Sequence, residues 1–190
     1  MANSSASAVG LWQFMYSTGK MYKLEISTFV DERRDPIKAT DAAVKYLRDL
    51  YNIYKDWHLV IAAYNCGPGN VNKAIKRSGD VKDYWKIYYR LPKETRSYVP
   101  AFIAANYVMN FYQNHNILPK SPDFPIITDT LMVNDYLHFN QVSEILGVPV
   151  EQIRSLNPQY RRDIIPASKE RPYSLVLPQE EISEIGRAHV

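Results

Sequence analysis

The stretch DWHLVIAAYNCGPGN, residues 56–70, decides the fold. Every residue from Leu59 to Ala63 is apolar, so a helix here has no polar face and must be buried on all sides. The Gly-Pro-Gly sequence of residues 67–69 then ends the helix. The sequence therefore predicts a buried central helix that delivers residues 64–66 to a turn.

An amphipathic helix is predicted just before this stretch. Apolar residues recur with i, i+3, i+4 and i+7 spacing from Ala39 to Tyr54, and charged residues occupy the opposite face. Asp35 supplies an N-cap and Pro36 a first-turn proline. The helix is therefore expected to begin near Asp35.

Two further helices are expected after the glycine turn. Asn70 is placed to cap a short helix with its apolar residues on one side. A longer helix is predicted over residues 93–114, with Pro100 inside it as a kink. No strand is predicted in this part of the chain, which favours a mainly α-helical domain.

The chain changes character at residues 119–128, where repeated prolines predict a stiff, extended linker. Beyond it, residues 130–133 (TLMV) and 173–178 (YSLVLP) predict strands. Two helices are predicted between them, and Gly147 ends the first. The C-terminal part is therefore expected to be a small βααβ module.

Composition excludes several classes of function. The 190 residues suffice for one domain plus a small module, and a net charge of +3 with both signs interspersed gives no reason to expect nucleic acid. A single cysteine, Cys66, rules out an intrachain disulfide and a multi-cysteine metal site. The longest apolar run, Leu59–Tyr64, is far shorter than the roughly 20 residues that span a bilayer. We therefore expect neither a membrane span nor a targeting segment in these residues.

Metal and thiol chemistry are not expected either. The four histidines are scattered without helix-face spacing or an HExxH motif, which favours surface or capping roles: His58, His115, His138 and His189. No base in the sequence points at Cys66 to activate it as a nucleophile. We expect no metal and no cofactor.

Three stretches are more specific: SASAVGLWQFM (5–15), AAYNCGPGNV (62–71) and LPKETRSYVP (91–100). In this order and spacing they resemble the lysozyme-like lytic transglycosylases of glycoside hydrolase family 23, and among these the membrane-bound murein transglycosylases of type D. Residues 31–51 also look like that group. The resemblance covers residues 2 to about 115.

This resemblance implies cleavage of peptidoglycan between N-acetylmuramic acid and N-acetylglucosamine by one glutamate that acts as acid and base. The muramic acid's own 6-hydroxyl closes a 1,6-anhydro ring, so the enzyme is a carbon–oxygen lyase. Most glycosidases use two carboxylates. A single glutamate must stay protonated near neutral pH, which requires a poorly solvated pocket.

Aligning the family's Ser-x-Ala-x-x-x-Gly-Leu-Trp-Gln pattern places the catalytic glutamate six positions before Met1, so it is absent from this sequence. The resemblance gives Glu94 a supporting role and does not make it the replacement acid. We therefore expect these 190 residues to be a fragment, inactive alone, of a longer enzyme.

The resemblance also implies roles for other residues. Ser4 and Gln13 match residues that hydrogen-bond the sugar near the scissile bond. Tyr64 and Asn65 match groups that line the glycan groove. Tyr98, with Glu94 one helical turn before it, matches the tyrosine that holds the catalytic carboxylate.

The C-terminal part resembles a LysM module, chiefly through ILGVPVEQIRSLNP (145–158). LysM modules bind glycans that contain N-acetylglucosamine, although VNDYLHF (133–139) departs from the family's usual Gly-Asp-Thr turn. The alternative, a packing module without glycan affinity, stays open. The final IGRAHV (185–190) is unrelated to the pattern and resembles the translation of a sequencing adapter.

These observations predict a lysozyme-like helical domain (1–118), a linker (119–128), a LysM-like module (129–179) and an adapter-derived tail (185–190). The expected partner is peptidoglycan, the expected state a monomer, and the expected location of the parent protein the periplasm or outer membrane. Two alternatives remain: a non-catalytic peptidoglycan-binding protein, and a hydrolase of the goose-type lysozyme kind.

Overall fold

The computed structural model describes residues 8–120 and 127–182. The chain divides into two compact units, one formed by Ala43–Lys120 and the other by Met1–Ala42 together with Ser121–Val190. Helices dominate the first unit, and short strands occur only in the second among the described residues. The predicted mainly α fold with a small α+β module is confirmed.

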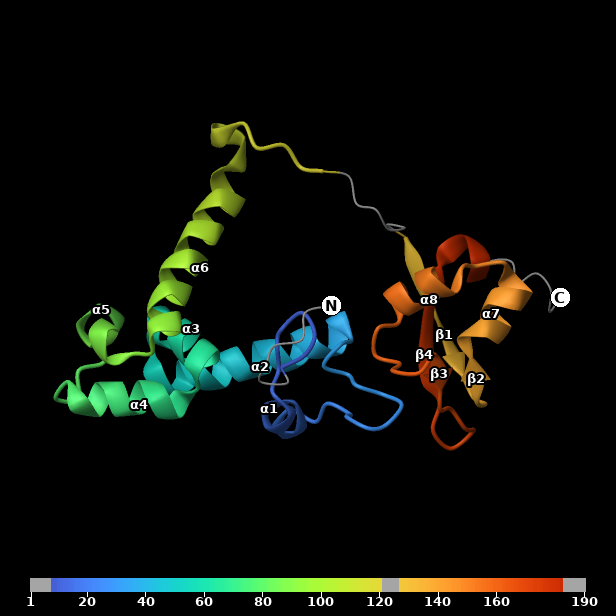
Figure 1. The fold of residues 1–190 in the computed structure, drawn as a ribbon, viewed down its shortest axis with the longest axis horizontal. Coiled ribbons are helices and arrows are strands. Elements are labelled where there is room, and N and C mark those ends of the chain that lie inside the picture. Colours follow the sequence, from blue (N-terminus) through green and yellow to red (C-terminus); the bar gives the residue numbers. More distant parts are fainter. Residues whose placement is uncertain (1–7, 121–126, 183–190) are drawn as a thin grey trace. The chain divides into compact units, whose positions relative to one another are not determined.

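Consecutive helices build the unit Ala43–Lys120, as Figure 1 shows. They are α2 (Pro36–Tyr54), which crosses the boundary between the units, α3 (Trp57–Cys66), α4 (Pro68–Arg77), α5 (Tyr84–Ile87), the 3₁₀ helix η1 (Tyr88–Arg90), α6 (Lys93–Phe111) and the 3₁₀ helix η2 (Tyr112–His115). Asp35 caps α2 as predicted, because its Oδ1 accepts from the backbone N–H groups of Ile37 and Lys38, both at 2.9 Å.

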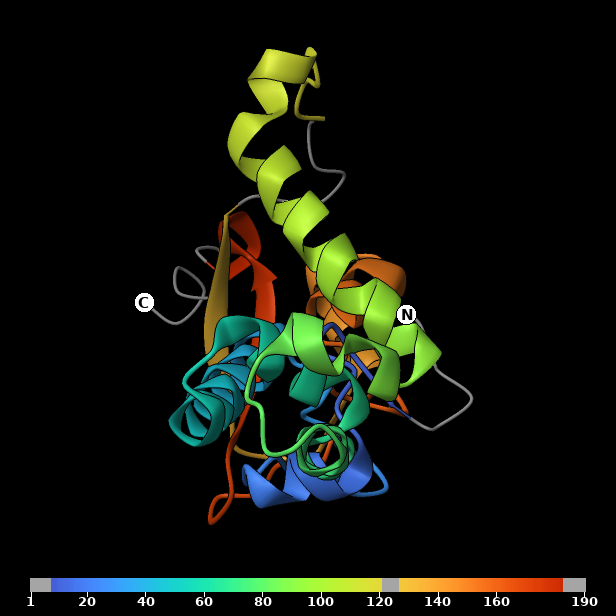
Figure 2. The same ribbon diagram turned by 90° about the vertical axis from the view of Figure 1, so that its left-hand side faces the viewer.

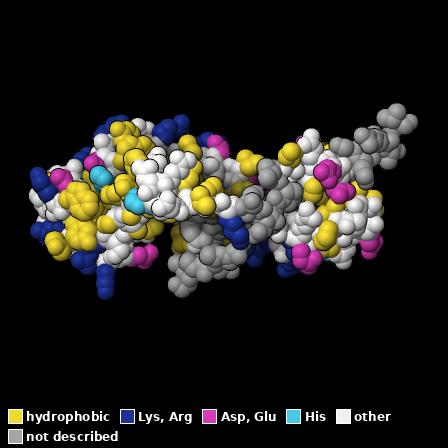
Figure 3. Space-filling view, turned by 90° about the horizontal axis from the view of Figure 1, so that it is seen from above, with side chains coloured by type: hydrophobic (Ala, Val, Ile, Leu, Met, Phe, Trp, Pro, Cys, Tyr) yellow, Lys and Arg dark blue, Asp and Glu magenta, His cyan; other side chains and the backbone are white. Residues whose placement is uncertain are grey.

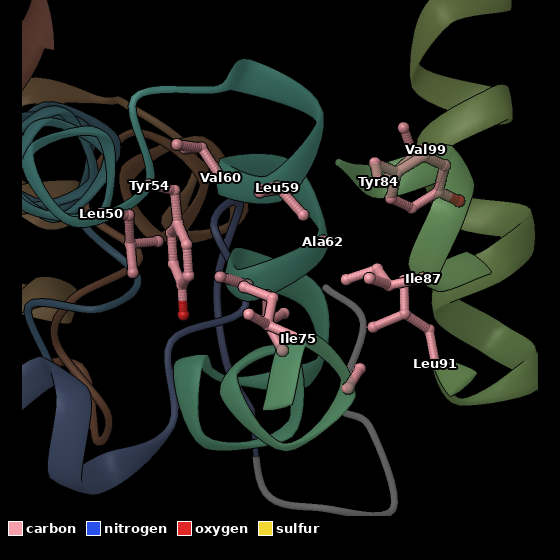
Figure 4. Close-up of a cluster of buried hydrophobic side chains, with 13 residues drawn as sticks. Leu50, Tyr54, Leu59, Val60, Ala62, Ile75, Tyr84, Ile87, Leu91 and Val99 are labelled. Carbon is pink, nitrogen blue, oxygen red and sulfur yellow. The ribbon is translucent and has the colours of Figure 1, made fainter. Parts of the chain in front are cut away.

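The helix α3 lies at the centre of this unit, as its all-round apolar sequence predicts. The carboxylate of Asp56 caps it by accepting from Leu59 N at 2.8 Å, and Gly67 ends it with a φ of 84°. Figure 4 shows the side chains that surround it, which come from every other α-helix of the unit. The buried set is Leu50, Tyr54, Leu59, Val60, Ala62, Ala63, Val71, Ala74, Ile75, Tyr84, Ile87, Leu91 and Val99.

The predicted capping role of Asn70 is wrong. The helix α4 begins at Pro68 with Gly67 as its N-cap, and Asn70 lies inside its first turn. A proline is pre-organised for the first helical position, so the helix starts earlier than the Asn70 signal suggested. The Asn70 amide instead donates to the Cys66 carbonyl at 2.7 Å, which satisfies an acceptor at the end of α3.

The long helix predicted over residues 93–114 is present as α6 and η2, with Pro100 inside α6. Its first turns lie beside α3, and its later turns extend beyond that helix in Figures 1 and 2. The side chains from Ala101 to Phe111 are all exposed. Hydrophobic side chains are open to view on this unit among Lys and Arg side chains in Figure 3.

The C-terminal module contains the two predicted strands and the two predicted helices. Strand β1 (Thr128–Val133) pairs antiparallel with β4 (Tyr173–Pro178), and α7 (Phe139–Leu146) and α8 (Val150–Leu156) lie between them in sequence. Gly147 ends α7 with a φ of 71°. A second pair, β2 (Leu137–His138) with β3 (Ile164–Ile165), was not predicted. Residues 185–190 and the centre of the predicted linker lie outside the described residues.

The N-terminal residues contribute one short helix, α1 (Tyr16–Met21), and two isolated antiparallel bridges, Val9 to Phe14 and Ile26 to Asp31. Val30 is 1% exposed and belongs to the buried cluster of the C-terminal module. Among the described residues, no helix has the length and apolar character needed to cross a membrane.

Candidate active site

The end of α3 meets the start of α6 at a small polar cluster. The hydroxyl of Thr95, which is fully buried, donates to Asn65 Oδ1 at 2.7 Å. The Asn65 amide nitrogen then faces Glu94 Oε1 at 3.4 Å, at the weak limit of a hydrogen bond. Thr95 thus fixes the orientation of the Asn65 amide, and the nitrogen points toward the exposed side.

Three tyrosines surround this cluster. The rings of Tyr46 on α2 and Tyr64 on α3 lie 5.4 Å apart, and Tyr98 on α6 is 42% exposed. Burial raises the pKa of Tyr64 well above its ordinary value, and the neighbouring phenols Tyr98 and Tyr46 add to the effect. The Tyr64 hydroxyl therefore stays protonated in the physiological range.

Cys66 occupies the last position of α3 beside the same cluster. Burial is the main cause that raises the pKa of its thiol, while a hydrogen bond with Thr95 opposes the shift in part. A thiol with a raised pKa is a poor nucleophile. This agrees with a structural role for Cys66.

Gln13 lies in a tight turn of the other unit. The bridge between Val9 and Phe14 closes the turn, and Gln13 adopts a φ of 51°, while its amide donates to Gly10 O at 2.6 Å. Trp12 Nε1 donates to Thr40 Oγ1 on α2 at 2.7 Å. These contacts fix the turn and leave the Gln13 side chain exposed.

Gly10 is required in this turn. Its φ is +81°, and a Cβ at this position would lie 1.9 Å from the backbone oxygen of Arg33. No side chain can be accommodated at that distance. The spacing of Gly10 and Gln13 therefore has a physical reason beyond the motif.

Four of the six site residues that the sequence predicts lie in one unit, at the α3–α6 junction: Tyr64, Asn65, Glu94 and Tyr98. Gln13 belongs to the other unit. Ser4 lies outside the described residues. The position assigned to the catalytic glutamate precedes Met1.

Two residues of the site were missed by sequence reasoning. Tyr46 was assigned only to the apolar face of α2, and Thr95 was quoted within its motif without a role. In each case the residue and its partner on α3 lie on different helices, so the contact leaves no periodic signal in the sequence. The one available hint for Thr95 was a threonine near the start of a helix, flanked by the site residues Glu94 and Tyr98.

The structure also bears on metal binding. In the described parts of the chain, no three His, Cys, Asp or Glu side chains come together in a way that could hold a metal ion. His138 instead caps α7, because its Nδ1 accepts from Asn140 N at 3.1 Å. This is the capping role that its isolated position suggested.

Two parts of the chain match models of known families. Residues 1–87 match the model of the Transglycosylase SLT domain. Residues 127–188 match the model of the LysM-like domain of the lytic transglycosylase MltD. The resemblances drawn from the motifs are confirmed, because each of the two parts is similar to the family that its motifs indicated.

Similarity to individual proteins covers more of the chain than these two models. The chain is 29% identical over 188 residues to membrane-bound lytic murein transglycosylase D of Escherichia coli strain K12, which covers 97% of the chain and 41% of that protein. The same values hold for this protein from E. coli O6:H1. A protein of Alteromonas sp. strain M-1 named for tributyltin chloride resistance is 40% identical over 75 residues, 39% of this chain and 36% of its own length. The chain spans about two fifths of the length of these curated relatives.

Proposed function

We propose that the protein to which these residues belong is a peptidoglycan lytic transglycosylase that cleaves between N-acetylmuramic acid and N-acetylglucosamine and forms 1,6-anhydro-muramic acid. The observation that carries the proposal is the cluster at the α3–α6 junction, where Thr95 orients Asn65 next to Glu94. The SLT match over residues 1–87 supports the same reaction class.

The chemistry needs one carboxylic acid and no water. The acid gives its proton to the glycosidic oxygen while the bond from this oxygen to the muramic C1 breaks. The resulting carboxylate then takes the proton of the muramic 6-hydroxyl while a bond forms between O6 and C1. The acid is regenerated, and the sugar carries the new ring.

The described residues would act around this acid, which we place six positions before Met1. The Asn65 amide and the Tyr64 hydroxyl would hold the sugar through hydrogen bonds. Tyr98, which is partly exposed beside Tyr64, would position the carboxylate of the acid, with Glu94 in support. Gln13 and Ser4 would bind the sugar near the scissile bond.

The C-terminal module would retain the enzyme on glycan strands that contain N-acetylglucosamine, and we place the parent protein in the periplasm or at the outer membrane. The match of residues 127–188 to a LysM-like domain supports the first statement, and the words membrane-bound and murein in the name of the E. coli relative support the second. We further propose a boundary between the catalytic domain and the module within residues 119–128, and a monomeric protein that acts without a cofactor.

The test compares residues 1–190 with a longer chain that contains the residues encoded upstream of Met1. Both are incubated with purified peptidoglycan, and the products are separated and identified by mass spectrometry. We expect anhydro-muropeptides from the longer chain only. Products from residues 1–190 alone would show that another residue acts as the acid.

Two variants of the longer chain sharpen the test. Tyr98→Phe should lower kcat by about 10- to 100-fold if its hydroxyl positions the acid, whereas the exposed control Tyr89→Phe should leave kcat unchanged. Reducing ends in place of anhydro sugars would identify a goose-type hydrolase. Retention on insoluble peptidoglycan without cleavage by the longer chain would identify a binding protein.

A further inference from the structure

A hairpin loop of the N-terminal region, closed by the bridge between Ile26 and Asp31, lies against the C-terminal module in the same compact unit. We call residues 25–31 the docking segment. Val30, in this segment, is 1% exposed and contributes to the buried cluster of the module. The module members of this cluster are Phe139, Val142, Val148, Ile153, Tyr160, Ile165, Ala167, Tyr173, Leu175 and Leu177. The core of the module is therefore completed by a residue from the SLT-matching region.

The backbone of the docking segment pairs with the loop that follows α8. Asp31 N donates to Gln159 O at 2.8 Å, and Arg161 N donates to Phe29 O at the same distance. Val30 and Tyr160 form an antiparallel bridge. A loop that bridges to another backbone segment in this way gains main-chain hydrogen bonds, and the burial of one side chain adds specificity.

Charged groups fix both ends of the contact. The Glu25 carboxylate lies 2.8 Å from Arg171 Nη2 and accepts from the Tyr173 hydroxyl at 3.0 Å. Arg161 Nη1 donates to Ser27 O at 3.2 Å, and the Arg162 guanidinium lies 5.8 Å from the centre of the Phe29 ring. The module thus presents cations and a hydroxyl to a hairpin loop with an acidic residue at its start.

The docking segment continues into the support of the Gln13 turn. Asp31, at the end of the segment, accepts from Arg33 Nε at 2.9 Å and from Nη2 at 2.8 Å, and both side chains are buried. Arg33 Nη1 donates to Phe14 O at 3.2 Å, and its backbone oxygen faces Gly10. An unbroken series of contacts therefore joins the module to the turn that holds Gln13.

We propose that the LysM-like module binds the chain's own residues 25–31 as a hairpin-loop ligand, and that this contact makes the module a structural support for the Gln13 turn. The module and the N-terminal residues up to Ala42 then support each other within one compact unit, although the linker separates the module from the unit Ala43–Lys120 along the sequence. The assignment of Gln13 to sugar binding rests on the proposed function, but the docking itself does not.

The test uses the full chain with a site for a specific protease in place of residues 121–126. After cleavage, gel filtration measures whether residues 1–120 and the C-terminal piece remain together. We expect them to elute as one species. Separation of the two unsubstituted pieces at micromolar concentration would overturn the proposal.

Two matched variants test the role of the segment. Val30→Asp places a charge in the apolar core and should weaken the association of the cleaved pieces by at least about 100-fold. Thr28→Asp adds the same charge at an exposed position of the same segment and should leave the association within about threefold of the original. Equal association of the two variants would contradict docking through Val30.

A charge exchange provides a test that does not depend on the core. Glu25→Arg should weaken association by about 10-fold, because it faces Arg171 with a like charge. Adding Arg171→Glu to this variant should restore part of the loss. If the double variant is as weak as the single one, or weaker, the ion pair does not contribute to docking.

Hydrogen exchange of the uncleaved chain tests the support of the Gln13 turn. Amides in residues 9–14 should exchange faster in Val30→Asp than in Thr28→Asp. Unchanged exchange in this turn, together with dissociation of the cleaved pieces, would disprove the supporting role and leave the docking. Because neither measurement requires catalysis, an inactive enzyme would not be mistaken for a failure of docking.

Discussion

The unit Ala43–Lys120 and the C-terminal module build their cores from different kinds of contact. In the first, each helix packs on neighbours that are near in sequence, and the site lies where two of them meet. In the second, Val30 and Glu25 contact the module although the whole unit Ala43–Lys120 separates them from it in the sequence, and the contact between Glu25 and Tyr173 spans 148 residues. The residues at which the family matches begin and end therefore need not be the limits of the compact units of the structure.

The largest loss of stability is expected at the buried ion pair of Asp31 and Arg33, next to the docking segment's contacts with the module. Arg33→Met leaves the buried Asp31 carboxylate with only the more distant Arg34 Nε, at 4.0 Å, which should lower the free energy of unfolding by about 3–5 kcal/mol. Urea denaturation followed by circular dichroism measures the loss, and Arg48→Met, at an exposed site, is the control. A loss below about 1 kcal/mol would show that water or another cation replaces Arg33.

A comparable but smaller loss is expected in the core of the other unit. Leu59→Ala removes a fully buried side chain from α3 and should lower the free energy of unfolding by about 2–5 kcal/mol. Val44→Ala at an exposed position of α2 should change it by less than about 0.5 kcal/mol. Hydrogen exchange should show the loss of protection in α3 to α6 and not in the C-terminal module. Equal loss in both units would mean that they unfold together.

The contact between Thr95 and Asn65 should have a moderate effect on stability. Thr95→Val keeps the shape of the side chain and removes the hydroxyl that satisfies Asn65 Oδ1, which should cost about 1–3 kcal/mol. Thr95→Ser keeps the hydroxyl and should retain most of the stability. If the two variants are equally stable, the hydrogen bond does not hold the junction of α3 and α6.

The smallest expected effect is a change in how steeply the free energy of unfolding declines at alkaline pH. Burial raises the pKa of Tyr84 to about 12, so the folded protein keeps a proton that the unfolded chain loses near pH 10. The contribution of neutral, buried Tyr84 to the free energy of unfolding is complete below about pH 10 and is lost as the pH rises toward 12. Tyr84→Phe should make the decline in this window shallower, by up to about 1.4 kcal/mol per pH unit.

Tyr89→Phe, at an exposed position, is the control for this measurement. The midpoint of urea denaturation is compared for the three proteins between pH 9 and 12. An identical decline in the Tyr84→Phe variant would show that the Tyr84 proton is not retained on folding.

The sequence was sufficient for the elements whose signals are local. Asp35 with Pro36 marked the start of α2, the all-apolar run from Leu59 to Ala63 marked a buried helix, and Gly67 marked its end. The Asn70 cap was wrong because a proline two positions earlier competes for the helix start. Strands β2 and β3 were missed because two residues are too few to show alternation.

The residues of the candidate site also divide into those that local signals predicted and those that depend on a distant partner. Spacing and motif brought together Tyr64, Asn65, Glu94 and Tyr98, since they lie at the ends of helices that the sequence marks clearly. Thr95 was missed because its partner, Asn65, is on another helix. The docking of Val30 was missed for the same reason at longer range, because periodicity reports only that a residue is apolar and not which surface covers it.

The long sequence separation between the docking segment and the module also has a consequence for the order of events during synthesis. At about 5–20 residues per second, Tyr173 is added about 7 to 30 s after Glu25, because 148 positions separate them. All helices of the unit Ala43–Lys120 are made within that interval, and their contacts are local enough to form early. The docking segment therefore has no partner during this part of synthesis. Val30 is exposed to solvent or to a chaperone until the last strand of the module has been translated.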